Sequence, residues 1–264
     1  MMKCKIVGLL TDFGLRDYYV SAVKAVILSI CPEAKIIDIS HQVTKWNILE
    51  GAFILKQSSR YLPEGSVIVG VVDPGVGSKR RSIVIKGERH YFIGPDNGLL
   101  YLAANEEGIK QIIEIRNEKY HLPRSGTFDG RDVFAPIAAH ILNGVPISEF
   151  GPEIKDIVKI EIPSPDFSGK KLHATILHVD HFGNIITNIP IAKFLEWKGK
   201  SESFLIKIDK RVFKASFSTS YEIAKTKLFL IPGSSEYMEI SVNKGSAAEI
   251  LGAKPGDKFD ITRD

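Results

Sequence analysis

The feature that most constrains the fold is an alternation of short apolar runs with amphipathic segments in the first three-fifths of the chain. Strands that alternate with helices predict an α/β domain with a mostly parallel central sheet, covered by helices on both faces. In chain order, the expected elements are strand Cys4–Leu10, a helix over Val20–Ile30, strand Lys35–Ile39, helix Trp46–Leu62, strand Ser66–Val72, the strand pair Ser82–Lys86 and Tyr91–Ile93, a short helix over Leu99–Ala104, strand Gln111–Ile115 and helix Val133–Leu142.

The pattern changes near residue 163. Residues 163–169 are polar and punctuated by Pro and Gly, as in a linker, and the segments beyond them are short and alternate with a period of two. Asp209-Lys210 lies where a hairpin turn would connect two of them. These features predict a smaller, all-β, barrel-like C-terminal domain, with domains at 1–164 and 165–264. Its expected strands are Leu172–Val179, Ile185–Ile189, Phe204–Ile208, Val212–Phe217, Lys227–Ile231 and Tyr237–Val242.

Composition excludes several classes of partner. Among 264 residues, 35 Lys and Arg face 31 Asp and Glu, and the net charge of +4 is spread over both domains, so we expect no nucleic-acid partner. No stretch reaches the roughly 18–20 apolar residues of a membrane helix, so we expect no membrane partner. The N-terminus shows no signal-peptide cleavage pattern, and Cys4 and Cys31 are too few for a disulfide framework. We therefore expect a cytoplasmic protein.

Acidic residues collect where predicted strands end, at Asp12, Asp38, Asp73 and Asp96. Ligands of open α/β sheets bind beyond the carboxyl ends of the strands, although Asp is also an ordinary turn former. A magnesium site from Asp12, Asp73 and Asp96 is conceivable from these positions. Zinc motifs, a complete nucleotide-binding glycine loop and a G-x-S-x-G nucleophile motif are all absent from the sequence.

Two further polar segments have simple structural interpretations. Asp132, within the segment 128–136, could cap the helix that follows it. The segment 179–188 could be a hairpin whose turn contains Gly183-Asn184.

Six motifs in a fixed order nevertheless carry a resemblance that covers residues 6–260. They are Leu10-Thr11-Asp12-Phe13-Gly14, Asp38-Ile39-Ser40-His41, Val72-Asp73-Pro74-Gly75-Val76-Gly77, Gly94-Pro95-Asp96-Asn97-Gly98-Leu99, Gly130-Arg131-Asp132-Val133-Phe134-Ala135-Pro136 and Phe182-Gly183-Asn184-Ile185. In this order they resemble the S-adenosyl-L-methionine hydroxide adenosyltransferase family, which is related to the fluorinases and chlorinases. The resemblance implies an enzyme in which water attacks the ribose 5′ carbon of S-adenosyl-L-methionine, giving adenosine and L-methionine. It implies no metal and no other cofactor.

The resemblance also implies roles for individual residues. Asp73 and Arg80 correspond to two members of an Asp-Arg-His triad that holds the water, and Arg81 is an adjacent rival for the arginine. Asp129 stands where the family usually has His. The resemblance also implies a homotrimer with sites between neighbouring chains. The implied substrate-binding residues are Asp12 for the ribose hydroxyls, Trp46 as an aromatic wall, Asp180 and Ser234 for the methionine end, Asn184 for the adenine, and Ser235, Val242 and Lys244 beside them.

Asp129 is compatible with more than one function. Two carboxylates around one water could share a proton between Asp129 and Asp73, which would preserve or slow base chemistry. The same substitution would suit a non-catalytic protein that binds S-adenosylmethionine or adenosine. A halide-using relative is a further alternative, although the family resemblance associates Asp73 and Gly130 with water. An RNA-binding barrel is a third, but the C-terminal domain lacks a basic stripe interleaved with aromatic residues.

Overall fold

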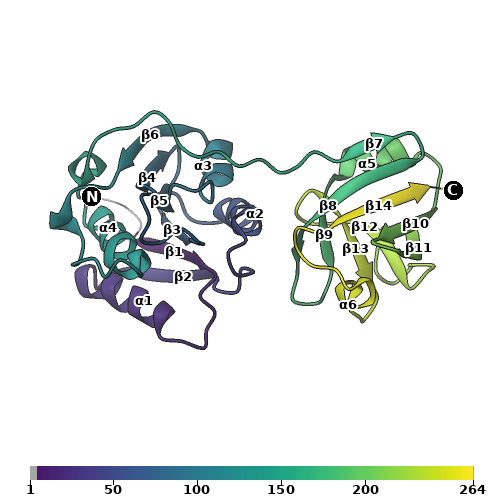
Figure 1. Ribbon diagram of the computed structural model, residues 1–264, viewed down its shortest axis with the longest axis horizontal. Helices are drawn as coiled ribbons and strands as arrows, with labels where there is room; N and C mark the ends of the chain where they lie inside the picture. Colours follow the sequence, from purple (N-terminus) through teal and green to yellow (C-terminus); the bar gives the residue numbers. More distant parts are fainter. Residues whose placement is uncertain (1–4, 264) are drawn as a thin grey trace. The chain divides into compact units, whose positions relative to one another are not determined.

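A computed structural model describes residues 5–263. The chain divides into two compact units, of which the first ends at Glu161 and the second begins at Ile162. Figure 1 shows helices on both sides of the sheet in the first unit and a strand-rich second unit.

The first unit is built on a six-stranded sheet with the strand order β2-β1-β3-β5-β4-β6. Its buried strands are rich in Val and Ile, which suit a pleated surface covered on both faces. The strands are β1 (Ile6–Thr11), β2 (Lys35–Ser40), β3 (Val67–Val71), β4 (Ser82–Gly87), β5 (Tyr91–Pro95) and β6 (Ile109–Glu114).

The expectation of a mostly parallel sheet is wrong, because this sheet is mixed. Strands β2, β1, β3 and β5 are parallel neighbours, but β4 is antiparallel to both β5 and β6. The reason is the short connection after β4, where the Gly87 N–H bonds the His90 carbonyl and the chain returns at once as β5. A connection of this length can join only antiparallel strands.

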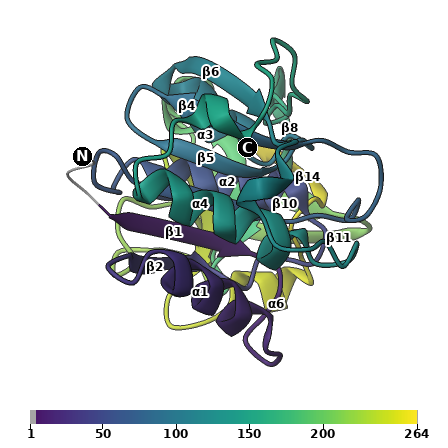
Figure 2. The ribbon, with the colours of Figure 1, turned by 90° about the vertical axis from the view of Figure 1, so that its left-hand side faces the viewer.

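Helices cover both faces of this sheet. The helices α1 (Tyr19–Ile30) and α4 (Ala135–Leu142) share one hydrophobic cluster with the sheet, and α2 (Ile48–Ser59) and α3 (Tyr101–Glu107) share the other. Figure 2 looks onto the face with α1 and α4. Short helical turns occupy Glu118–Tyr120 and Ile147–Phe150, and a π-helical turn at Gly130–Phe134 leads directly into α4.

The two faces follow from the alternation of side chains along each strand. On β3, Val67 and Val69 belong to the cluster under α1 and α4, whereas Ile68 between them belongs to the cluster under α2 and α3. Both kinds of position must therefore be apolar, and the strand reads as a continuous hydrophobic run.

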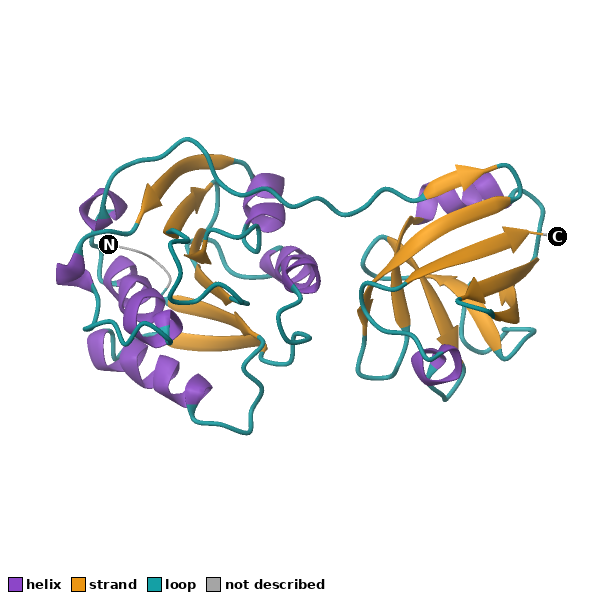
Figure 3. Cartoon of the chain, viewed as in Figure 1, coloured by secondary structure: helices purple, strands orange, loops and turns teal. Residues whose placement is uncertain are grey.

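The second unit contains the expected barrel. In the strand order β14-β10-β11-β12-β13-β9-β8, each strand is hydrogen-bonded to the next. β14 also pairs with β8, which closes the ring, and β7 pairs with the first residues of β8. The expected turn at Asp209-Lys210 is confirmed, since Ile208 pairs with Arg211 across it. The strands, orange in Figure 3, are β7 (Asp166–Ser168), β8 (Lys171–Val179), β9 (Ile185–Pro190), β10 (Ser203–Ile208), β11 (Arg211–Phe217), β12 (Leu228–Pro232), β13 (Tyr237–Val242) and β14 (Lys258–Arg263).

Four elements of this unit were not expected from the sequence. They are β7, β14, α5 (Ile191–Lys198) and α6 (Ala247–Leu251). α5 contributes Phe194 and Trp197 to the barrel's hydrophobic cluster. Among residues 5–263, no helix combines the length and the apolar character needed to cross a membrane. Cys31 is buried as a free thiol, and Cys4 lies outside the described residues.

Adjacent positions on α1 give a matched test of this packing. Ile27 is fully buried against the sheet, whereas Leu28 is 40% exposed. We expect Ile27→Ala to lower the free energy of unfolding by about 2–5 kcal/mol, because it opens a cavity. Leu28→Ala should change it by no more than about 0.5 kcal/mol. Denaturant unfolding followed by circular dichroism measures both, and equal effects would contradict this assignment of faces.

Candidate active site

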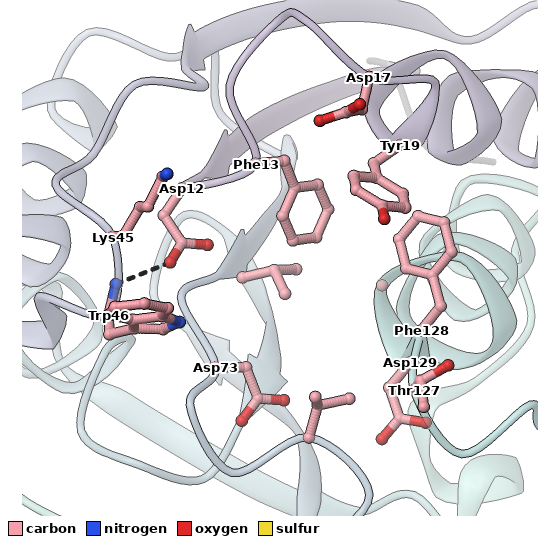
Figure 4. Close-up of a pocket in the computed structure, with 13 residues that line it drawn as sticks. Asp12, Phe13, Asp17, Tyr19, Lys45, Trp46, Asp73, Thr127, Phe128 and Asp129 are labelled. Carbon is pink, nitrogen blue, oxygen red and sulfur yellow. Dashed lines mark hydrogen bonds between the residues drawn. The ribbon is translucent and has the colours of Figure 1, made fainter.

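One cavity of the first unit lies beyond the carboxyl ends of β1 and β3. These strands are parallel neighbours, with Thr11 opposite Val71, so Asp12 and Asp73 just beyond them lie at the same edge of the sheet. Both line a cavity of about 490 Å³ together with Trp46 and Asp129. Figure 4 shows the four side chains around this space.

The other two acidic residues that were expected at strand ends do not join this cavity. The Asp38 carboxylate pairs with Lys24 and His41. The Asp96 carboxylate accepts from Arg81 and from the Val158 N–H. The magnesium site considered from Asp12, Asp73 and Asp96 is therefore not formed, and within residues 5–263 no three His, Cys, Asp or Glu side chains are grouped to hold a metal ion.

Arg80, which the resemblance groups with Asp73, forms an ion pair with it. Its Nε and Nη2 donate to Asp73 Oδ2 at 2.9 and 2.5 Å, and its Nη1 donates to the Ser82 hydroxyl at 2.8 Å. The guanidinium also lies over the Phe134 ring, 5.5 Å from its centroid. Arg81 turns instead to Asp96 and Asp156, so it is not the arginine of this cluster.

One oxygen of Asp73 is left without a partner. Among the described residues, none forms a hydrogen bond with Asp73 Oδ1, although this atom is shielded from solvent. A buried carboxylate oxygen without a donor is costly, so such atoms usually have a ligand or water as their partner. Because Asp73 lines the cavity, this oxygen is an acceptor suited to a bound molecule.

Asp129 is fully buried and forms ion pairs with two arginines. Its Oδ2 accepts from Arg80 Nη2 at 2.6 Å and from Arg124 Nη2 at 2.7 Å, and its Oδ1 accepts from Arg124 Nε at 3.1 Å. The Arg80 guanidinium therefore connects Asp129 to Asp73, so that each carboxylate has a cation as its partner. Sequence reasoning missed Arg124, although an extra buried carboxylate implies a nearby cation.

Asp132 does not cap the following helix as the sequence suggested. Its carboxylate accepts from the Ser125 N–H and hydroxyl at 2.8 and 2.7 Å and from Arg131 Nε. It therefore fastens the preceding loop rather than the first turn of the helix.

The backbone of Trp46 is held in an unusual conformation beside Asp12. Its φ is +64°, a left-handed value that is strained for a bulky residue, and its N–H donates to Asp12 Oδ2 at 2.9 Å. The indole is 69% exposed, so it is not part of the hydrophobic core. Burial raises the pKa of the Asp12 carboxyl and the Asp73 charge raises it further, while the Trp46 N–H opposes both effects.

Aromatic rings form another part of the cavity lining. The rings of Phe13 and Tyr19 meet that of Phe128 edge to face, with centroids 5.7 and 5.2 Å away. In Figure 4 they lie across the cavity from Trp46. The sequence analysis missed these three residues, because aromatic residues near helices are usually core.

The second unit has a separate polar turn between β8 and β9. Asp180 Oδ1 accepts from the N–H groups of Phe182 and Asn184, and its Oδ2 accepts from the Asn184 side chain at 2.9 Å. The hairpin interpretation is therefore correct for the backbone, and it leaves the Asn184 side chain fixed by Asp180. Asn184, Val242 and Lys244 line one pocket of about 470 Å³ with Tyr221, which sequence reasoning missed.

Ser234 and Ser235 lie outside that pocket. They belong to the turn between β12 and β13, which the Gly233 N–H closes by bonding the Tyr237 carbonyl at 2.9 Å. Glu239 on β13 was also missed. Burial raises the pKa of its carboxyl, and the Asp180 charge raises it further.

Comparisons with known proteins agree with the motif order. Models of the SAM hydroxide adenosyltransferase N-terminal and C-terminal domains match residues 7–151 and 174–260. A Methanocaldococcus jannaschii protein named (R)-S-adenosyl-L-methionine hydrolase is 39% identical over 269 residues, covering 97% of this chain and 95% of its own. A fluorinase of Actinoplanes sp. is 32% identical over 70% of this chain and 71% of its own.

Solved structures extend this agreement to the fold. The crystal structure of a conserved protein from Thermotoga maritima matches with a TM-score of 0.89 at 37% identity, covering 97% of this chain and 100% of that one. With both domain models matched in the order that the motifs predict, the chain belongs to the S-adenosyl-L-methionine hydroxide adenosyltransferase family.

Proposed function

We propose that this protein hydrolyses S-adenosyl-L-methionine to adenosine and L-methionine. The observation that carries the proposal is the buried, partnerless Asp73 Oδ1 in the cavity, on a carboxylate whose other oxygen is already paired with Arg80. Relatives named (R)-S-adenosyl-L-methionine hydrolase at 34–39% identity support it, and their name favours the (R) sulfonium diastereomer.

The leaving group of this reaction needs no proton from the protein. An oxygen–carbon bond forms between water and the ribose 5′ carbon while the carbon–sulfur bond breaks. The electron pair of that bond stays on sulfur, so the sulfonium leaves as the neutral thioether of methionine and needs no acid. The water must lose a proton, which Asp73 Oδ1 accepts as general base and passes to solvent.

Arg80 supports this step electrostatically. Its contacts with Asp73, Ser82 and Asp129 use its Nε–H, one Nη1–H and both Nη2–H groups. One Nη1–H is left to stabilise negative charge as it develops on the attacking oxygen.

Binding of the substrate is divided among the remaining residues. Asp12 accepts hydrogen bonds from the ribose hydroxyls, and the exposed Trp46 ring forms a flat wall against the nucleoside. In the second unit, Asn184, Val242 and Lys244 hold the adenine.

The methionine end of the substrate is assigned to Asp180, Ser234 and Ser235. Asp180 attracts the ammonium group, and Glu239 adds a second carboxylate beside it. The serines hydrogen-bond the carboxylate end.

The assembly, the compartment and the cofactor requirement belong to the same proposal. We propose a cytoplasmic homotrimer in which neighbouring chains complete each site, and a reaction without any metal or other cofactor. Exposed apolar side chains at Leu15 (67%), Tyr18 (63%) and Trp46 (69%) support a partner surface on the first unit.

The direct test is chromatography of the purified protein incubated with S-adenosylmethionine, with and without chloride. Adenosine and methionine in equal amounts, unaffected by chloride, are expected. A halogenated nucleoside would show a halide-using enzyme, and bound but unchanged substrate would show a binding protein.

Asp73→Asn is expected to lower kcat by about 10²–10⁴-fold, because the amide cannot take the proton from water. The dissociation constant for adenosine, measured by calorimetry, should stay nearly unchanged. Asp38→Asn is the matched control, since this carboxylate lies near the C-terminal end of β2 but pairs with Lys24 and His41. Turnover by Asp73→Asn equal to that of the control would contradict the general-base role.

Acid pH is expected to weaken adenosine binding through Asp12. Its raised pKa means that protonation begins at a higher pH than the ordinary Asp value of about 3.9. Protonation turns one carboxyl oxygen into a donor and makes the group a weaker acceptor for the ribose hydroxyls, so the dissociation constant rises as the pH falls through this pKa. Asp12→Asn should bind weakly at every pH and lose this dependence; if the dependence persists in that variant, another group is responsible.

A further inference from the structure

Arg124 is a charged residue of the site to which the family resemblance assigns no role. It lies in the loop before the π-helical turn at Gly130–Phe134, and its guanidinium takes both oxygens of Asp129 in a bidentate pair. Its side chain is 44% exposed, whereas that of Asp129 is fully buried. Arg124 therefore shields a buried carboxylate from the solvent side.

The charges around Arg80 balance only when Arg124 is counted. Asp73 and Asp129 carry two negative charges and share Arg80 through its Nη2. Without Arg124, one guanidinium would have to satisfy two buried carboxylates, and an uncompensated buried charge is strongly unfavourable. With Arg124, the four groups are neutral overall.

The loop that carries Arg124 is fastened in place. The Leu122 N–H donates to the Asp132 carbonyl at 2.8 Å, and Ser125 donates twice to the Asp132 carboxylate. On its other side, a Cβ added at Gly77 would lie only 2.3 Å from the Gly126 carbonyl oxygen, so this loop packs directly on the loop that follows Asp73. These contacts hold the Arg124 backbone on both sides, close to the turn that begins at Asp129.

We propose that Arg124 is a positioning residue for hydrolysis: it neutralises Asp129, which in turn orients Arg80 toward Asp73. The inference rests on the proposed function, because its effect is measured in that reaction. Arg124 touches neither the water nor the substrate in this role. If Arg124 is lost, Asp129 draws the Arg80 guanidinium toward itself and away from the geometry that leaves one Nη1–H for the attacking oxygen.

A double-substitution cycle tests this role. Arg124→Gln is expected to lower kcat by about tenfold or more with KM within about twofold, since it acts through Arg80 and not on substrate binding. In an Asp129→Asn background there is no carboxylate to neutralise, so adding Arg124→Gln should change kcat by no more than about twofold. Two residues that act through one ion pair show such coupling, and independent residues do not.

Arg116→Gln is the matched control. Arg116 is also an arginine in an ion pair, with Glu114, but its side chain is 65% exposed and away from Asp129. Its kcat and KM should match those of the unsubstituted protein. Arg124→Lys keeps the charge but not the bidentate geometry, and it should retain more activity than Arg124→Gln.

The outcomes separate the two proposals. Adenosine from the unsubstituted protein, with equal loss of kcat for Arg124→Gln in both backgrounds, overturns the positioning role alone. A rise in KM with unchanged kcat also overturns it, because Arg124 would then bind substrate. No adenosine from the unsubstituted protein overturns the proposed function and this role with it. Unfolding curves for each variant show whether a loss of kcat reflects a loss of structure, and a loss that tracks unfolding in both backgrounds counts against positioning.

Discussion

The ion pairing around Arg80 is the interaction on which the site depends. Asp73 and Asp129 are both buried, and a buried carboxylate is stable in its charged form only with a cation and hydrogen-bond donors beside it. Arg80 serves both, and Phe134 supports its guanidinium from one side. The pairing leaves a single oxygen of Asp73 without a donor, which concentrates the accepting capacity of the cluster at one point in the cavity.

The mixed sheet explains how Arg80 reaches this cluster. The carboxyl ends of the parallel strands β1 and β3 place Asp12 and Asp73 at one edge. Because β4 is antiparallel to β5, with Ser82 opposite Pro95, β4 begins at the edge where β5 ends. Arg80, just before β4, therefore lies beside residues that follow parallel strands. In an all-parallel sheet the start of a strand would lie at the opposite edge.

The local sequence pattern predicts some of the site residues but not the others. Asp12 and Asp73 could be predicted as site residues, because the end of an apolar strand and the turn residues after it are visible in the local sequence. The direction of β4 depends on a short return connection. The strained backbone of the exposed Trp46 depends on the hydrogen bond that its N–H donates to Asp12, which follows β1. Arg124 depends on a loop fastened by Asp132 and packed on Gly77, contacts that have no sequence period. The sequence resemblance could assign a family, but not the cation that accompanies Asp129.

Charge neutrality at the cluster also bears on the reaction itself. The substrate is a cation that becomes neutral as the sulfur leaves, so an uncompensated negative charge near the sulfonium would stabilise the substrate more than the transition state. An uncompensated positive charge would repel the substrate. A cluster in which Asp73 and Asp129 are matched by Arg80 and Arg124 avoids both penalties. The cluster also keeps Asp73 Oδ1 as an acceptor for the proton of water. Because Arg124 neutralises Asp129, position 129 can hold an acidic residue without adding net charge to the cluster.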